Sequence, residues 1–232
     1  MSASEGTPTA STLVVHHLND SRSQRILWLL EELEVPYEIK KYQRTPEMVA
    51  PAELSAIHPL GGAPVITDGE VTLAESGAIV EYIIQKYGGG KAVPPEAGKI
   101  DELFYVHYCE GSLMPLLVNS LIFSIIPERA PFLLRPLLRS VFANVRAKML
   151  DVRLKKHSEL IESHLSKDDR EWFAGGKEPT ASDIMMGFAL EAWHAKSPES
   201  LGPKTKAYIQ RMHDRPAYKR SIEKGGEYQY AK

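Results

Sequence analysis

Residues 63–87 of the 232-residue chain read APVITDGEVTLAESGAIVEYIIQKY, and this stretch decides the fold. Two short β-branched runs, APVIT and VTLA, flank Asp68-Gly69, a pair that strongly favours a tight hairpin turn. From Glu75 to Tyr87 the apolar residues recur at helical spacing on one face, which holds Ile79, Val80, Ile83, Ile84 and Tyr87. The stretch therefore predicts a β-hairpin followed directly by an amphipathic helix.

The sequence before this stretch alternates strand and helix signals. TLVVHHL (12–18) is typical of a strand, SRSQRILWLLEEL (21–33) of a helix and YEIKKYQ (37–43) of a second strand, with a short helical turn around PAELSAI (51–57). A helix between two strands implies a right-handed crossover, so these strands should pair in parallel. The order β-α-β, hairpin, α predicts a thioredoxin-like α/β domain over residues 12–88, after a flexible tail at 1–11.

The sequence after Gly88 has a different character. Residues 89–98 are rich in glycine and proline, which predicts a linker. Residues 99–232 show no strand pairs but four long helical stretches, over 100–124, 132–165, 181–194 and 204–224. Thr180 and Asp183 have the spacing of a capping box, in which a hydroxyl and a carboxylate bind free backbone N–H groups. An all-helical domain should therefore follow the α/β domain.

Composition excludes several classes of protein. The 28 Lys and Arg residues against 30 Asp and Glu give a net charge of −2, which does not favour nucleic-acid binding. Cys109 is the only cysteine, which excludes an internal disulfide, a CxxC redox pair and a multi-cysteine zinc site. His157 and His164 share a helical face without a third ligand, so we expect no metal site. The longest uncharged run, 111–127, is short for a membrane span and predicts a buried helix.

Residues 129–156 combine eight Lys or Arg residues and one acid with many apolar residues. A helix of this kind can lie on a membrane surface. It can also bury its apolar residues while the arginine stems cover the rim, and we favour this interpretation over peripheral membrane contact. A dimer interface and a site that helps to hold an anionic conjugate are further alternatives. Nucleic acid is not expected as a partner, because no aromatic surface accompanies the positive charge.

Two serines at the start of the first helix are candidates for chemistry. Ser21 and Ser23 lie where unpaired N–H groups and the helix dipole attract an anion, of which a thiolate is one example. Lowering a thiol pKa by two units needs about 2.7 kcal/mol of preferential thiolate stabilisation. The alternative is that either serine is an ordinary N-cap.

Two further features could bind a peptide. If the Ala63-Pro64 bond is cis, Val65 presents its N–H and C=O groups to an extended peptide; the alternative is a trans proline in an ordinary loop. Glu75 and Ser76 begin the next helix. The Glu75 carboxylate can bind an ammonium group and the Ser76 hydroxyl a carboxylate, so together they suit a zwitterionic amino-acid group. A second helix cap is the alternative there.

Taken together, SRSQRILWLLEEL, HPLGGAPVI, LAESGAIVEYI, PTASDI and RPAYKRSIEKGG resemble the cytosolic glutathione transferase (GST) superfamily, in particular its fungal and bacterial serine-type branch. The resemblance runs from about Thr12 to Gly226. It implies that Pro64 is cis, that Val65 makes main-chain bonds to the cysteine of glutathione, and that Glu75 and Ser76 hold its γ-glutamyl end. It also implies that Asp183 is a folding element and not a catalyst.

The sequence departs from the family pattern at one place and is ambiguous at another. Gly62 stands where the family often has Lys or Gln, so another side chain must neutralise the glycine carboxylate; of His58, Lys40, Lys41 and Arg44 we favour His58. Counting back from Arg25, Ser21 falls where serine-type members carry the thiol-activating hydroxyl, with Ser23 as competitor. No cysteine stands there, which argues against disulfide-reductase chemistry.

The resemblance implies a two-domain GST, expected as a cytoplasmic homodimer. Glutathione would be the co-substrate, with no further cofactor, and its thiolate would attack a small hydrophobic electrophile or reduce an organic hydroperoxide. We expect the electrophile pocket between the domains to be lined by Tyr105, Tyr108, Ser112 and Met114. The alternative is a non-catalytic glutathione- or ligand-binding protein on the same fold.

Overall fold

The structure is a computed structural model that describes residues 13–231, so the expected tail at 1–11 lies outside the described residues. The N-terminal part contains β1 (Val14–Leu18), α1 (Gln24–Leu33), β2 (Glu38–Tyr42), α2 (Glu53–Ile57), β3 (Val65–Asp68), β4 (Val71–Ala74) and α3 (Ser76–Tyr87). The C-terminal part is helical and contains η1 (Glu96–Gly98), α4 (Lys99–Tyr108), η2 (Cys109–Leu113), α5 (Met114–Arg129), η3 (Phe132–Leu134), α6 (Arg135–Val145), η4 (Arg146–Asp151), α7 (Val152–Leu165), η5 (Lys167–Asp169), α8 (Ala181–Lys196), η6 (Pro198–Ser200), α9 (Pro203–Asp214) and α10 (Pro216–Gly225).

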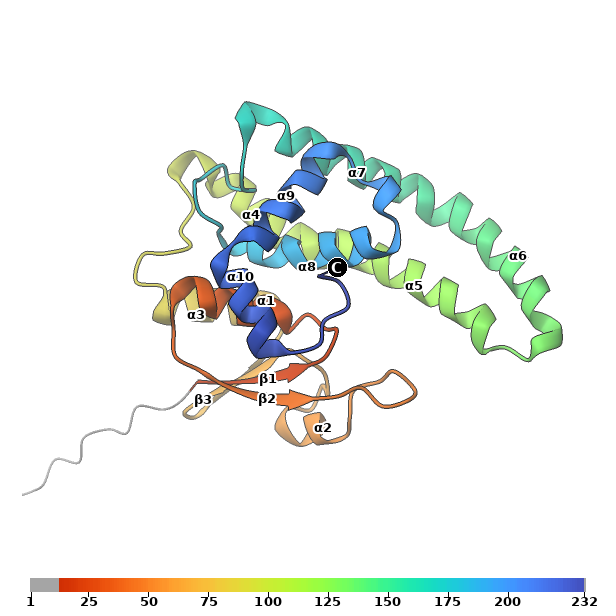
Figure 1. The fold of residues 1–232 in the computed structure, drawn as a ribbon, viewed down its shortest axis with the longest axis horizontal. Helices are drawn as coiled ribbons and strands as arrows, with labels where there is room; N and C mark the ends of the chain where they lie inside the picture. The colour runs from red at the N-terminus through yellow and green to blue at the C-terminus, as the bar shows by residue number, and fades with distance from the viewer. Residues whose placement is uncertain (1–12, 232) are drawn as a thin grey trace, which may run out of the picture.

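The strands form one four-stranded sheet in the order β2-β1-β3-β4. β1 and β2 are parallel, as a crossover through α1 requires, whereas β3 is antiparallel to both β1 and β4. Gly69 and Glu70 join β3 to β4, which confirms the predicted hairpin with its turn one residue later than expected. α1 and α3 lie on one side of the sheet and α2 on the other (Figure 1), so the N-terminal domain has the predicted thioredoxin-like fold.

The last helical stretch needs a correction. The sequence predicts one helix over 204–224, but the chain forms α9 and α10, with Arg215 between them in an extended conformation (ψ 133°). Pro216 explains the break, because the ring of a proline disfavours helical geometry at the residue before it.

The long helix from Glu96 to Arg129 is more exposed than predicted, and so is the helical hairpin that its last part, α5, forms with η3 and α6. By length and composition this helix could cross a membrane, although helices from the cores of soluble proteins pass the same test, and 22% of its most apolar window is buried. α6 has no buried residue, and Phe132 and Leu133 at the hairpin tip are 74% and 76% exposed. Figure 1 shows α5 and α6 projecting away from the sheet. The expectation that residues 111–127 and 129–156 bury their apolar side chains therefore holds for Leu113, Met114, Leu116, Leu150 and Leu154 but not for the segment between them in the single chain.

Close packing of α1 against the C-terminal helices joins the two domains. A side chain at Gly187 of α8 would place its Cβ 2.6 Å from Met212 Sδ and 3.0 Å from a ring carbon of Trp28, so glycine permits this approach. The buried guanidinium of Arg25 forms an ion pair with Glu110 and lies over the ring of Phe188. α1 therefore holds the sheet against the helical domain.

The capping box at α8 is confirmed. Asp183 is fully buried, and its carboxylate accepts hydrogen bonds from Phe173 N (2.9 Å), Thr180 N (2.9 Å) and the Tyr208 hydroxyl (3.1 Å). The side chain thus joins the start of α8 to the preceding loop and to α9. These contacts are structural, since Asp183 does not line the cavity described below.

Candidate functional site

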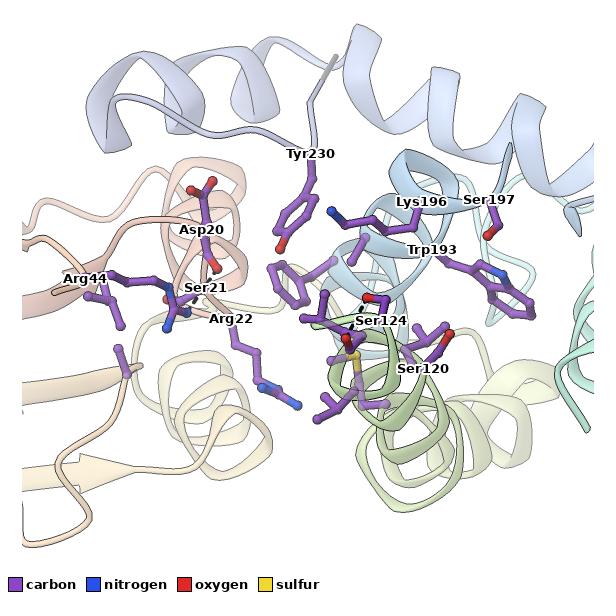
Figure 2. Close-up of a pocket in the computed structure, with 18 of the residues that line it drawn as sticks. Asp20, Ser21, Arg22, Arg44, Ser120, Ser124, Trp193, Lys196, Ser197 and Tyr230 are labelled. Carbon is purple, nitrogen blue, oxygen red and sulfur yellow. Dashed lines mark hydrogen bonds between the residues drawn. The ribbon is translucent and has the colours of Figure 1, made fainter. Parts of the chain in front are cut away.

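A cavity of about 470 Å³ lies where the two domains meet. One wall comes from the β1–α1 connection and from the loops that follow β2 and precede β3, and the opposite wall from α5 and α8. Figure 2 shows Asp20, Ser21 and Arg44 on the first side, with Ser120, Ser124 and Trp193 on the second. The first side carries the polar groups of Asp20, Ser21, Arg22 and Arg44, whereas the second side is mostly apolar, which suits a polar ligand next to an apolar one.

Ser21 and Ser23 occupy different positions in this site. Ser21 lines the cavity, whereas Ser23 is fully buried behind it and does not line it. The two hydroxyl oxygens are 2.7 Å apart, and Ser21 Oγ also accepts a hydrogen bond from Ser23 N at 3.2 Å. Ser23 Oγ contacts His17 Nδ1 at 2.8 Å on its far side. Of the two serines, Ser21 is thus the one at the cavity, with 6% of its surface exposed against 0% for Ser23.

Neither serine caps α1 as the alternative interpretation expects. The helix begins at Gln24, three residues later than the sequence pattern suggests, and its N-cap residue Ser23 makes no side-chain cap bond. Asp20 has a positive φ of 48°, which turns the chain before the helix starts. The Ser23 hydroxyl points back to β1, where it contacts both N and O of Leu18 at 3.2 Å.

The expected peptide-binding residues come together at the ends of β3 and β4, but Val65, Glu75 and Ser76 do not line the cavity, which reaches only the preceding Gly62 and Ala63. The Ala63-Pro64 bond is cis, as the family resemblance implies. Val65 is the first residue of β3 and is paired with Ala74, the last residue of β4, so Glu75 and Ser76 lie next to it. Glu75 is exposed, adopts a positive φ of 71° and makes no cap bond to α3. Since non-glycine residues avoid this conformation, its presence marks a candidate binding position.

The residue expected to hold the glycine carboxylate lies outside the cavity wall. His58 ends α2, and its Nδ1 accepts a hydrogen bond from Leu60 N at 3.3 Å. Arg44, one of the alternatives, lines the cavity beside Gly62 and is held by the carbonyl oxygens of Asp20 and Met48. Of the four basic candidates His58, Lys40, Lys41 and Arg44, Arg44 is the one that lines this cavity.

The apolar wall differs from the expected one. Met114 lines the cavity, but Tyr105, Tyr108 and Ser112 do not. Both tyrosines are buried in an aromatic cluster with Phe104, His157, His164 and Phe173, and Ser112 is exposed to solvent. The π-helical turn η2 separates the tyrosines from Met114. Because a π turn holds an extra residue, it rotates the following helix face relative to the preceding one.

The sequence analysis missed most of the apolar wall. The residues in question are Leu117, Val118 and Leu121 of α5, Leu154 of α7, and Phe188, Ala192 and Trp193 of α8. The α5 residues follow Met114 at helical spacing, so continuing the face from Met114 would have found them. No comparable sequence signal connects α7 or α8 to this face.

The C-terminal segment closes one side of the cavity. Gln229 N donates a hydrogen bond of 2.8 Å to Asp20 Oδ1, which ties this segment to the β1–α1 connection. Tyr230 follows and lines the cavity, and Figure 2 shows its ring and the Lys196 side chain extending between the two walls. The last turn of the chain is therefore part of the site.

Other candidate groups do not enter the site. Cys109 is buried, its thiol donates to Met185 O at 3.1 Å, and burial raises its pKa to about 11, so it is a poor nucleophile. Among residues 13–231, no group of three or more His, Cys, Asp or Glu side chains is arranged to hold a metal ion.

Comparison with known proteins gives consistent matches. Residues 10–85 match the family model described as "Glutathione S-transferase, N-terminal domain". A Schizosaccharomyces pombe protein named Glutathione S-transferase 3 is 35% identical, with 91% of this chain and 87% of the relative covered. A glutathione S-transferase structure from Actinobacillus pleuropneumoniae is 25% identical, with a TM-score of 0.71 and 95% of both chains covered. A Pseudomonas fluorescens glutathione transferase family member, solved with two glutathione bound, is 22% identical, with a TM-score of 0.69 and 94% and 95% covered.

Proposed function

This chain belongs to the glutathione S-transferase superfamily, and we propose that it catalyses attack of the glutathione thiolate on hydrophobic electrophiles, with Ser21 as the thiol-activating residue. The observation that carries the proposal is that Ser21 lines the interdomain cavity, opposite an apolar surface. Ser23, the competing residue, is fully buried and out of reach of a ligand.

Glutathione would lie extended along the N-terminal wall. The main chain of Val65, after the cis Pro64, would bind its cysteine residue, as expected from the family resemblance. The Glu75 carboxylate would bind the γ-glutamyl ammonium group, while the Ser76 hydroxyl and the start of α3 would bind the carboxylate beside it. Arg44 would neutralise the glycine carboxylate in place of the side chain that Gly62 lacks.

Catalysis would combine activation with positioning. The Ser21 hydroxyl donates a hydrogen bond to the sulfur and stabilises the thiolate, while the thiol proton passes to solvent. The sulfur then forms a bond to the electrophilic carbon, and the leaving group departs with its electron pair. The apolar wall around Leu121, Phe188 and Trp193 would hold the electrophile facing the sulfur, which makes the encounter effectively unimolecular. With an organic hydroperoxide, two glutathione molecules would be oxidised to the disulfide as the peroxide is reduced to alcohol and water.

Conjugation of an aryl halide tests the proposal. The wild-type chain should catalyse it, and the Ser21→Ala variant should bind immobilised glutathione but turn over slowly. A peroxide assay on the same two proteins tests the second activity. Retention on glutathione with no turnover in either assay would contradict the proposal and support the non-catalytic binding protein.

Assembly and location are also proposals. We expect a cytoplasmic homodimer, which would cover apolar side chains that one chain leaves exposed, among them Ile100 and Phe104 of α4. Peripheral contact with an anionic membrane is the second candidate, because the exposed tip around Phe132 and Leu133 is flanked by Arg129 and Arg135. Light scattering tests the dimer, and a monomer would contradict it. Flotation with anionic vesicles tests membrane contact, and a chain that does not float with the vesicles would contradict that candidate.

A further inference from the structure

Three side chains form a continuous row of hydrogen bonds from the sheet to the cavity. His17 Nδ1, on β1, is 2.8 Å from Ser23 Oγ, and Ser23 Oγ is 2.7 Å from Ser21 Oγ. His17 and Ser23 are buried, with 3% and 0% of their surface exposed. Ser21, the last member, lines the cavity. The direction of these hydrogen bonds therefore decides whether the Ser21 hydroxyl can donate its proton to a ligand.

Counting protons leaves two principal arrangements of this row. In the first, His17 carries its proton on Nδ1 and donates to Ser23 Oγ, which donates in turn to Ser21 Oγ. Ser21 Oγ then accepts from both Ser23 Oγ and Ser23 N, so its two lone pairs are occupied and its own proton is free for the cavity. In the second, His17 Nδ1 is unprotonated and accepts from Ser23. Ser23 then accepts from Ser21, which leaves no Ser21 proton for a ligand.

We propose that His17 and Ser23 are positioning residues, and that the Nδ1-protonated form of His17 directs the Ser21 hydroxyl proton towards the sulfur of bound glutathione. The inference rests on the proposed function and adds to it the part of the chain that orients the activating hydroxyl. Ser21 touches the sulfur; Ser23 and His17 act through it.

The surroundings of His17 support this role. Burial, with a smaller effect from Lys41 and an opposing one from Asp20, lowers the pKa of His17 to about 4. The ring is therefore neutral at pH 7 and carries a single N–H proton, which is on either Nδ1 or Nε2. Nε2 lies on the side of Gly225 and has no hydrogen bond to any residue in the described part of the chain, whereas Nδ1 faces Ser23 Oγ. A proton on Nδ1 is donated to Ser23 Oγ at 2.8 Å, whereas a proton on Nε2 forms no hydrogen bond to the described residues, although the unpaired Oε1 of Gln24 lies on the same side of Gly225.

In the first arrangement, the hydroxyl proton and both lone pairs of Ser23 also have hydrogen-bond partners. Its oxygen accepts from Leu18 N and from His17 Nδ1, and its single proton goes to Ser21 over the shorter of its oxygen–oxygen contacts, 2.7 Å against 3.2 Å to Leu18 O. Two donors on Ser21 Oγ polarise its O–H bond and make it a stronger donor to an anion. The row of hydrogen bonds thus leaves the Ser21 hydroxyl as a strong hydrogen-bond donor for a thiolate.

The pKa of the bound thiol is the readout that a merely structural role would not move. It is measured by the ultraviolet absorbance of the thiolate as pH is varied with glutathione bound. Ser23→Ala should raise this pKa by about one unit, the equivalent of one hydrogen bond. His17→Leu should raise it in the same direction. His17→Asn, which has the same shape as the leucine variant but carries an amide donor at the δ position, should keep it near the wild-type value.

His16→Phe is the matched control, because His16 is also a buried histidine of β1 but contacts Tyr42 and not the serines. It should leave the thiol pKa unchanged. The proposal is overturned if the leucine and asparagine variants of His17 shift the pKa equally, or if both Ser23→Ala and His17→Leu leave it unchanged. A wild-type chain whose bound thiol titrates like free glutathione would instead contradict the proposed function itself.

A second measurement needs no ligand and no variant beyond an assignment control. In the ¹⁵N NMR spectrum of the whole chain at neutral pH, the His17 ring should show a protonated Nδ1 and an unprotonated Nε2, with His17→Asn used to assign the signals. An unprotonated Nδ1 would overturn the proposal whether or not glutathione binds.

Discussion

Replacing Ser21 by alanine should slow conjugation at neutral pH without weakening glutathione binding. The variant removes a hydroxyl that lines the cavity, and Ser23, fully buried 2.7 Å behind it, cannot take its place. The proposed contacts to the tripeptide at Val65, Glu75 and Ser76 lie on other elements and remain. The loss should therefore appear in the reactivity of the sulfur.

The size of the effect follows from the lost hydrogen bond. A hydrogen bond to a charged group contributes about 1.5–3 kcal/mol, which corresponds to a rise of about one to two units in the pKa of the bound thiol. If the bound thiol has a pKa about two units below the free value of 8.5, its thiolate fraction at pH 7, and with it turnover, should fall about 3- to 25-fold, because the thiolate is the nucleophile. Above about pH 9 the difference should narrow, since a free thiol with a pKa near 8.5 is then largely ionised.

The assay is aryl halide conjugation across pH, with glutathione and electrophile varied in turn. The control is Ser166→Ala, which removes an exposed hydroxyl of the residue after α7 that, among the described residues, binds only Glu162 O. Equal turnover of Ser21→Ala and wild type at pH 7 would refute the assignment. A rise in the KM for glutathione with unchanged kcat would also refute it, because the hydroxyl would then serve binding and not activation.

Three further predictions concern stability and pH. Asp183→Ala removes the acceptor of two backbone N–H groups and the Tyr208 hydroxyl and should lower the unfolding free energy by about 3 kcal/mol, or the Tm by about 6–12 °C; an unchanged Tm would contradict this. Gly187→Ala places a Cβ against Met212 and Trp28 and should destabilise by about 1–3 kcal/mol in a denaturant titration, whereas Gly111→Ala, where a Cβ meets nothing within 4 Å, should not. The pKa of His17 is about 4 in the folded chain against an ordinary 6.5, so the stability that depends on its neutral form is fully present above pH 6.5 and is lost as pH falls to 4. The free energy of unfolding should fall by up to about 3 kcal/mol over this range in the wild type but not in His17→Leu. An equal fall in both proteins would show that another group causes it.

The fold of the N-terminal domain could be predicted because its signals are local. The hairpin around Gly69 and the helix from Ser76 to Tyr87 each follow from turn chemistry or apolar spacing within a few residues. The capping box at Thr180 and Asp183 is local in the same sense. The division of 204–224 was missed, although Pro216 is a local signal, because the apolar spacing continues across it.

The site was harder to predict because it depends on contacts between distant segments. The difference between Ser21 and Ser23 arises from a turn at Asp20 and from the packing of Ser23 against β1, and neither is encoded in the serine spacing. The π turn at Cys109–Leu113 intervenes between the tyrosines and the cavity wall. Trp193 and Tyr230 reach the cavity only because α8 and the C-terminal segment fold back on the first domain.

The exposed hairpin shows a different limit of sequence reasoning. Alternating basic and apolar residues over 129–156 are compatible with burial, with membrane contact or with an interface between copies. The structure of one chain excludes burial at the tip, where Phe132 and Leu133 are exposed. What covers them is a matter of assembly, which local spacing does not encode.

The central claim is that glutathione lies along the N-terminal wall with its sulfur at Ser21. A crystal structure of the chain with glutathione bound tests it most directly. We predict the sulfur within hydrogen-bond distance of Ser21 Oγ, the cysteine main chain paired with Val65 and the γ-glutamyl group beside Glu75 and Ser76. A sulfur bonded to any other side chain, or a tripeptide that does not reach Val65, Glu75 and Ser76, would contradict the account.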